Sequence, residues 1–215
     1  MRPKVVSVKR KQRGRAPLSF RFVPKATDDG IDQTLTMHNH TDVSFVPTIR
    51  YVARDIWGRE LPHVVTQTVH GSDRGLPLLP AGGTGHDILR FDGPGGRDVR
   101  GVDIELVDLL ENDHPALEAD TRAVMIDLAE KATADPAEFW GIGLVNPNPF
   151  GVRLRVSLLA FEERVRDYPR QVVDVVTLQD DVDMASNSND IIWLPEDVRG
   201  EFQAVDHHLV PQVLV

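Results

Sequence analysis

The sequence contains no cysteine among its 215 residues. This absence excludes disulfide frameworks, thiolate metal centres and cysteine nucleophiles. No apolar stretch approaches the roughly 18 residues that a membrane-spanning helix needs. Residues 1–25 also lack the continuous apolar segment that follows the charges of a secretory signal. We therefore expect a cytoplasmic protein without a transmembrane segment.

Catalytic and phosphate-binding motifs are missing as well. No Gly-x-Ser-x-Gly nucleophile elbow occurs, and the glycine-rich run at 93–96 is followed neither by Lys-Ser/Thr nor by a helical pattern. Ser, Thr, His and Asp lie close together in sequence at 71–73 and 83–87, but catalytic triads form from distant segments. The sequence therefore favours a protein that is not an enzyme.

Charge is distributed unevenly along the chain. The net charge is −9, yet residues 1–25 carry nine basic and no acidic side chains, which leaves 15 basic against 33 acidic residues in the remainder. Such an arm can contact nucleic acid or anionic lipid. No aromatic interleaving supports base stacking, and the acidic remainder opposes approach to phosphate. We interpret the arm as a solvated segment or as one that pairs with the acidic body, and we expect no nucleic-acid partner.

The most informative feature of the sequence is a repeated order of patterns. A turn at Met37–Thr41 precedes a β-like run at Phe45–Arg54, and Leu144–Pro149 precedes a matching run at Val152–Phe161. Asp-Val-Arg-Gly also occurs twice, at 98–101 and 197–200. One supersecondary unit used twice is typical of two similar domains in tandem.

The offset between the two copies falls from 107 residues at Asn39 to 99 at Asp98. The first copy therefore holds about eight extra residues, and the Gly/Pro-rich stretch at 71–83 is where they fit, because an insertion into a surface loop costs little.

Alternating apolar and polar residues predict strands in both copies. Pro47 interrupts one of them and indicates an edge strand or a bulge. Turns are expected at Asp28–Gly30 and Asp55–Gly58. The expected strands are 4–9, 18–23, 34–39, 45–54, 63–70, 86–91 and 102–109 in the first copy, and 123–128, 152–161, 172–178, 191–194 and 202–210 in the second.

These patterns predict an all-β fold with two tandem antiparallel immunoglobulin-like β-sandwich modules joined by a short linker. We expect the first module with its basic arm at 1–111, the linker at 112–121 and the second module at 122–215. Ala, Leu and Glu richness favours a short helix at about 115–119 before the strand. A single helix over 115–131 is the alternative.

One group of residues resembles a known family. Asn39, Tyr51–Asp55, Gly58 and Leu79–Gly83 resemble the FxLYD-like, immunoglobulin-like bacterial β-sandwich domains. Asp55 and Gly58 match the family's pattern outright, whereas Tyr51, Ala53 and Arg54 stand for its Phe, Leu and Tyr. The resemblance implies a β-sandwich fold and a role as a binding or structural module.

The polar segment at 179–190 is a candidate metal site. Asp181, Asp183, Asn187 and Asn189 supply the hard oxygen atoms that Ca²⁺ prefers. The segment lacks the glycine and the glutamate of an EF-hand, and a plain polar hairpin is the alternative interpretation. We expect no other cofactor.

Two histidines, His38 and His40, lie two residues apart and so on one face of a strand, where both could reach a metal. His207 and His208 occur at the corresponding end of the second copy. Solvent-exposed histidines at strand ends are the alternative interpretation.

Trp57 is the candidate partner-binding residue, because a tryptophan in a hairpin turn either folds back on the sheet or contacts a partner. Trp140 and Trp193 lie within strand patterns, so we expect both in the core.

The sequence favours a non-catalytic protein-binding or assembly module with a protein partner or a homo-oligomer. Two hypotheses stay open: a His/Asp site, with or without a metal, in a groove between modules, and nucleic-acid or membrane-surface binding through the basic arm.

Overall fold

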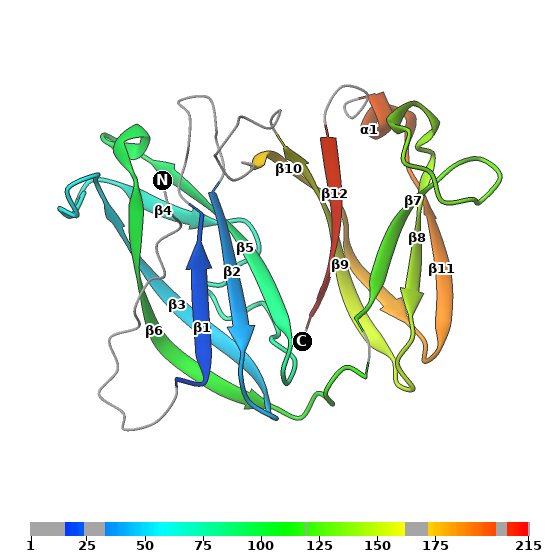
Figure 1. Cartoon of the computed structure of the whole chain (residues 1–215), viewed down its shortest axis with the longest axis horizontal. Coiled ribbons are helices and arrows are strands. Elements are labelled where there is room, and N and C mark those ends of the chain that lie inside the picture. The colour runs from blue at the N-terminus through cyan, green and yellow to red at the C-terminus, as the bar shows by residue number, and fades with distance from the viewer. Residues whose placement is uncertain (1–15, 24–32, 119, 162–171, 201–205, 215) are drawn as a thin grey trace. The chain divides into compact units, whose positions relative to one another are not determined.

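The computed structural model describes residues 16–23, 33–118, 120–161, 172–200 and 206–214 (Figure 1). The strand expected at 4–9, the turn at Asp28–Gly30 and most of the basic arm lie outside these residues. The described chain is mostly β, which confirms the all-β prediction. Among the residues just given, those up to 116 and residues 172–173 belong to one compact unit, and the others belong to a second. No helix in the described parts of the chain is long and apolar enough to cross a membrane.

The first unit contains two antiparallel sheets. Their strands are β1 (Leu18–Phe22), β2 (Gln33–Asn39), β3 (Ser44–Arg54), β4 (Val65–Thr68), β5 (Thr84–Asp92) and β6 (Gly101–Asn112). One sheet has the order β1-β2-β5-β4, and the other consists of β3 and β6. A short 3₁₀ turn, η1 (Gly96–Asp98), precedes β6.

Alternation along the strands builds the core of this unit. In β1, Leu18, Phe20 and Phe22 are buried, whereas Ser19 and Arg21 are exposed, as the sequence pattern predicts. One hydrophobic cluster draws residues from both sheets, so the sheets share a core. Its buried members are Leu18, Phe20, Phe22, Leu35, Met37, Phe45, Ile49, Ala53, Leu79, Leu89, Val99, Val102 and Ile104.

The irregularity expected at Pro47 is present. The pairing of β3 with β6 shifts between Thr48 and Ile49, one residue past Pro47, so that Thr48 faces Asp108 and Ile49 faces Leu106. Val107 is the extra residue of this β-bulge, because no residue of β3 faces it.

The second unit also contains two antiparallel sheets. Its strands are β7 (Arg122–Ile126), β8 (Gly141–Asn146), β9 (Val152–Phe161), β10 (Val172–Met184), β11 (Ser188–Trp193) and β12 (Asp206–Val213). The sheet orders are β11-β8-β7 and β10-β9-β12. A 3₁₀ turn, η2 (Pro136–Glu138), and a one-turn helix, α1 (Glu196–Gly200), complete the unit. Leu144, Leu154, Val156 and Leu158 are among its buried residues.

The helix expected at about 115–119 is wrong for the residues that the structure describes there, and the longer alternative over 115–131 is wrong because β7 occupies part of it. Side chains instead accept two backbone N–H groups in and just before this segment. Asn112 Oδ1 accepts the N–H of His114 at 2.8 Å, and Asn148 Oδ1 accepts that of Glu118 at 2.8 Å.

The expectation that Trp193 lies in the core is also wrong. Trp193 ends β11 with 47% of its surface exposed, because β11 is an edge strand in which no residue is fully buried. Trp140 is half-buried and precedes β8, and the guanidinium of Arg199 from α1 lies 3.6 Å from its ring centroid.

Candidate functional site

The turn that follows β3 is the candidate site, and its backbone is closed by two hydrogen bonds. The Gly58 N–H donates to Asp55 O, and the Asp55 N–H donates to Arg59 O, both at 3.0 Å. Gly58 has a φ of 80°, in the left-handed region that glycine adopts without strain. This geometry agrees with the turn predicted at Asp55–Gly58.

Asp55 organises the turn from within. Its side chain is 6% exposed. One carboxylate oxygen accepts the N–H groups of Trp57 at 2.9 Å and Arg59 at 2.8 Å, and the other accepts Arg59 Nε at 2.7 Å. Burial opposes ionisation of this carboxyl, but the hydrogen bonds and charge of Arg59, with the Trp57 N–H, outweigh it and lower the pKa of Asp55.

Trp57 projects from this closed turn. Its side chain is 76% exposed and its neighbour Ile56 is 55% exposed. The Arg59 guanidinium lies 4.6 Å from the centroid of the Trp57 ring, within the range of a cation–π contact. The turn therefore holds an indole and a guanidinium together at the surface.

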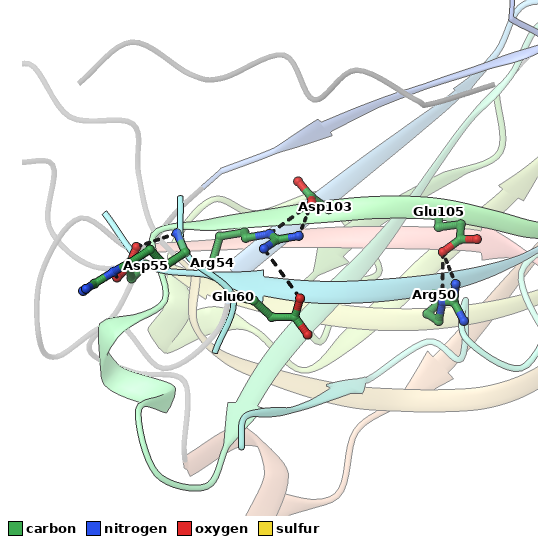
Figure 2. Close-up of polar contacts among 7 residues, drawn as sticks. Arg50, Arg54, Asp55, Glu60, Asp103 and Glu105 are labelled. Carbon is green, nitrogen blue, oxygen red and sulfur yellow. Dashed lines mark hydrogen bonds and ion pairs between the residues drawn. The ribbon is translucent and has the colours of Figure 1, made fainter. Parts of the chain in front are cut away.

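Ion pairs line the neighbouring face of β3 and β6 (Figure 2). Arg50 contacts Glu105, and Arg54 lies 2.7 Å from Asp103 and 3.7 Å from Glu60. These carboxylates are more than half exposed, so each pair contributes only about 0.2–1 kcal/mol to stability. The main effect of these ion pairs is to fix the positions of the charged groups on this face.

The four residues predicted to bind Ca²⁺ do not share one loop. Asp181 and Asp183 lie in β10, Asn187 lies in the turn after it and Asn189 lies in β11. Arg153 Nε is 3.2 Å from Asp181 Oδ1, so one predicted ligand already pairs with a cation. Within the described ranges, no three His, Asp or Glu side chains form a group that could hold a metal. Calcium binding here stays a prediction.

His38 and His40 come together as the sequence predicts. Their ring centroids are 4.5 Å apart. Each ring contacts a hydroxyl: His38 Nδ1 lies 3.0 Å from Thr84 Oγ1, and His40 Nε2 lies 2.7 Å from Ser19 Oγ. The corresponding pair, His207 and His208, lies in β12.

Sequence reasoning missed a buried polar cluster in the first unit. Asp87 is completely buried in β5, and its carboxylate accepts the N–H groups of His70 and Ser72, both at 2.9 Å. Tyr51 Oη from β3 lies 2.6 Å from Ser72 Oγ. The signal was a carboxylate at a position where the alternation of β5 places inward side chains, between Gly85 and Leu89.

This cluster attaches the Gly/Pro-rich stretch to the sheets. Burial, above all, raises the pKa of Tyr51, and the nearby carboxylates of Asp87 and Asp73 raise it further, although its hydrogen bond with Ser72 acts in the opposite direction. The cluster is therefore a structural device of the fold, since Ser72, His70 and Asp87 are all shielded from solvent.

No protein-family model matches the chain, and no curated protein matches it.

Proposed function

We propose that this chain is a non-catalytic protein-binding or assembly module, built from two immunoglobulin-like β-sandwiches, that binds a protein partner or another copy of itself. The observation that carries the proposal is Trp57, a large aromatic side chain held on a closed turn with 76% of its surface exposed. The shared core of the two sheets in the first unit supports the sandwich architecture.

The fold does not require tryptophan at this position. Asp55 binds the Trp57 residue only through its backbone N–H, and Gly58 supplies the left-handed backbone conformation. A small polar residue at position 57 would close the same turn. The indole therefore contributes little to folding, and its exposed apolar surface is available to a partner.

The geometry also lowers the cost of binding. Side chains that must be immobilised at an interface lose about 0.5–1.5 kcal/mol each. Here three hydrogen bonds that Asp55 accepts, together with the cation–π contact of Arg59, already restrict the turn. Trp and Arg are residue types that dominate interface energetics, so the pair at Trp57 and Arg59 suits a binding anchor.

The test compares the full chain with Trp57→Ala and with Trp193→Ala, a matched loss of an exposed tryptophan in the other unit. Light scattering measures self-association, and quantitative affinity purification from lysate measures recovered partners. We expect Trp57→Ala to reduce the association that the wild type shows by about tenfold or more, and Trp193→Ala to leave it unchanged. A wild-type chain that is strictly monomeric and recovers no partner would refute the proposal.

A further inference from the structure

Strand β6 is 12 residues long, and its outer edge is open as far as the described part of the chain shows. Among the described strands, β6 pairs only with β3. Outside β3, no described residue hydrogen-bonds to the backbone of residues 101–112, apart from the N–H of Leu109, which donates to the side chain of its neighbour Asp108. Such an edge presents a row of backbone donors and acceptors to an added strand.

The opposite edge of the same sheet is covered. Along β3, the N–H groups of Phe45 and Ile49 donate to Leu79 O and Ser72 O, each at 2.9 Å. The Gly/Pro-rich stretch therefore occupies the outer side of β3. The β6 edge is where this two-stranded sheet can grow.

Two common protections of a strand edge differ between β6 and its counterpart β12. Strand β12 carries Pro211, which has no N–H to offer a new neighbour. Strand β6 contains no proline, and its protections are the bulge at Val107 and a set of acidic side chains. Acidic charge repels an edge of the same kind, but it attracts a basic one.

The charge on β6 has one sign. Its sequence contains Asp103, Glu105, Asp108 and Glu111, all exposed, and no Lys or Arg. Arg50 and Arg54 contact only one oxygen each of Glu105 and Asp103 (Figure 2), and within the described residues the second oxygens accept no hydrogen bond. Those oxygens are acceptors for incoming ammonium or guanidinium groups.

The alternation of buried and exposed residues in β6 determines which residue types suit a strand bound at its edge. Val102 and Ile104 face the core, whereas Asp103 and Glu105 between them face solvent. A strand that extends the sheet continues both faces, so its side chains alternate between apolar residues on the core side and basic residues beside the carboxylates. Two β6 edges placed together would oppose acid with acid, which disfavours a second copy of the strand as the occupant.

We propose that the open edge of β6 binds an extended basic segment of a partner protein by β-strand addition. Backbone hydrogen bonds to β6 provide affinity, and an alternation of Lys or Arg with β-branched residues provides selectivity. This site is separate from the Trp57 turn and does not depend on it.

The probe is a capped peptide of roughly nine residues that alternates Val and Lys, a length that covers most of β6. Its dissociation constant is measured by calorimetry with the full chain at low salt, beside an otherwise identical peptide with a central proline. We expect the uninterrupted peptide to bind at least about tenfold more tightly, and its affinity to fall as salt is raised, because exposed charges are screened. Equal binding of the two peptides would show charge attraction without strand addition and would overturn the proposal.

Charge reversal on the protein gives the matched comparison. Asp108→Lys combined with Glu111→Lys changes two exposed carboxylates of β6, and Asp42→Lys combined with Asp92→Lys makes the same change in charge at exposed positions outside β6. We expect the first pair to weaken peptide binding by about tenfold, and the second by less than about twofold. An equal loss from both pairs would overturn the proposal.

Hydrogen exchange locates the bound peptide. Amides of residues 101–112 should exchange more slowly in the complex, whereas those of the Trp57 turn should not change. Val107→Pro, at the bulge residue that faces no residue of β3, should abolish this protection with β3 and β6 still paired.

Trp57→Ala should leave the peptide affinity unchanged, so failure of the proposed function and failure of this site give different results. If the full chain binds no peptide, the proposal is overturned. This holds also where the chain's own basic residues 1–25 keep the peptide from the β6 edge.

Discussion

Asn39 in the first unit and Asn146 in the second make nearly the same contacts. Both are completely buried at the end of a strand. Asn39 Nδ2 donates to Val43 O at 2.8 Å and to the carbonyls of Leu79 and Pro80. Asn146 Nδ2 donates to Phe150 O and to Ala185 O, each at 2.8 Å. In each unit one amide joins the turn four residues later to a segment about 40 residues later.

The units differ in where the next strand goes. Strand β10, which follows β9, lies beside it in one sheet, whereas β4, which follows β3, pairs with β5 in the other sheet. The stretch held by Asp87 takes the free side of β3 instead, through Ser72 O and Leu79 O. An inserted loop thus replaces a sheet neighbour, and it needs a buried carboxylate to hold it.

The strongest test of the similarity removes each asparagine. Asn39→Ala and Asn146→Ala each leave two or more backbone carbonyls without their donor, so each should destabilise its own unit by about 3 kcal/mol. Hydrogen exchange with mass spectrometry measures the opening free energy of each unit separately.

Asn112→Ala is the control for these two variants. This half-buried asparagine also ends a strand, and its Oδ1 accepts one N–H, from His114. Its loss should cost about 1 kcal/mol. A cost below that value for either Asn39→Ala or Asn146→Ala would mean that the two asparagines do not perform the same task.

The second test concerns the difference. Asp87→Ala leaves the buried N–H groups of His70 and Ser72 without an acceptor, and we expect a loss of about 2 kcal/mol confined to the first unit. Amides of residues 70–79 should lose protection first in hydrogen exchange, while those of β8 and β9 keep theirs. Equal loss in both units would contradict the view that Asp87 serves the inserted loop. Asp92→Ala, an exposed carboxylate at the end of β5, should have almost no effect.

The sequence predicts most strands of the described residues, because alternation along β1, β3 and β9 has a period of two that helices cannot produce. It does not predict which sheet β4 or β10 joins, since the same alternation suits either. The sequence does not predict the buried contacts of Asp87 and Tyr51, because a polar residue on a strand is usually exposed. Only the fold brings Ser72 next to them. The sequence places Trp57 in the turn beside Asp55 and Gly58 but leaves open whether its ring folds back on the sheet. Its cation–π contact with Arg59 depends on a carboxylate geometry that spacing alone does not specify.

The smallest expected change in stability comes from substitution of Tyr51. It tests whether the stability of the first unit depends on alkaline pH in a way that the second unit lacks at the corresponding position. The position that corresponds to Tyr51 in β9 is Leu158, which is buried and does not ionise. Burial, with the charges of Asp87 and Asp73, raises the pKa of Tyr51 above its ordinary value of about 10. Above that pH the unfolded chain loses the phenolic proton while the folded unit keeps it, so this contribution to stability is complete below about pH 10 and is lost as the pH rises toward the folded-state pKa.

Tyr51→Phe should cost about 1 kcal/mol at neutral pH through the lost hydrogen bond to Ser72, and should make the first unit less sensitive to alkali than the wild type. Urea unfolding of both proteins from about pH 8 to pH 11 measures this; parallel curves would mean that the phenol ionises as freely in the folded unit as in the unfolded chain.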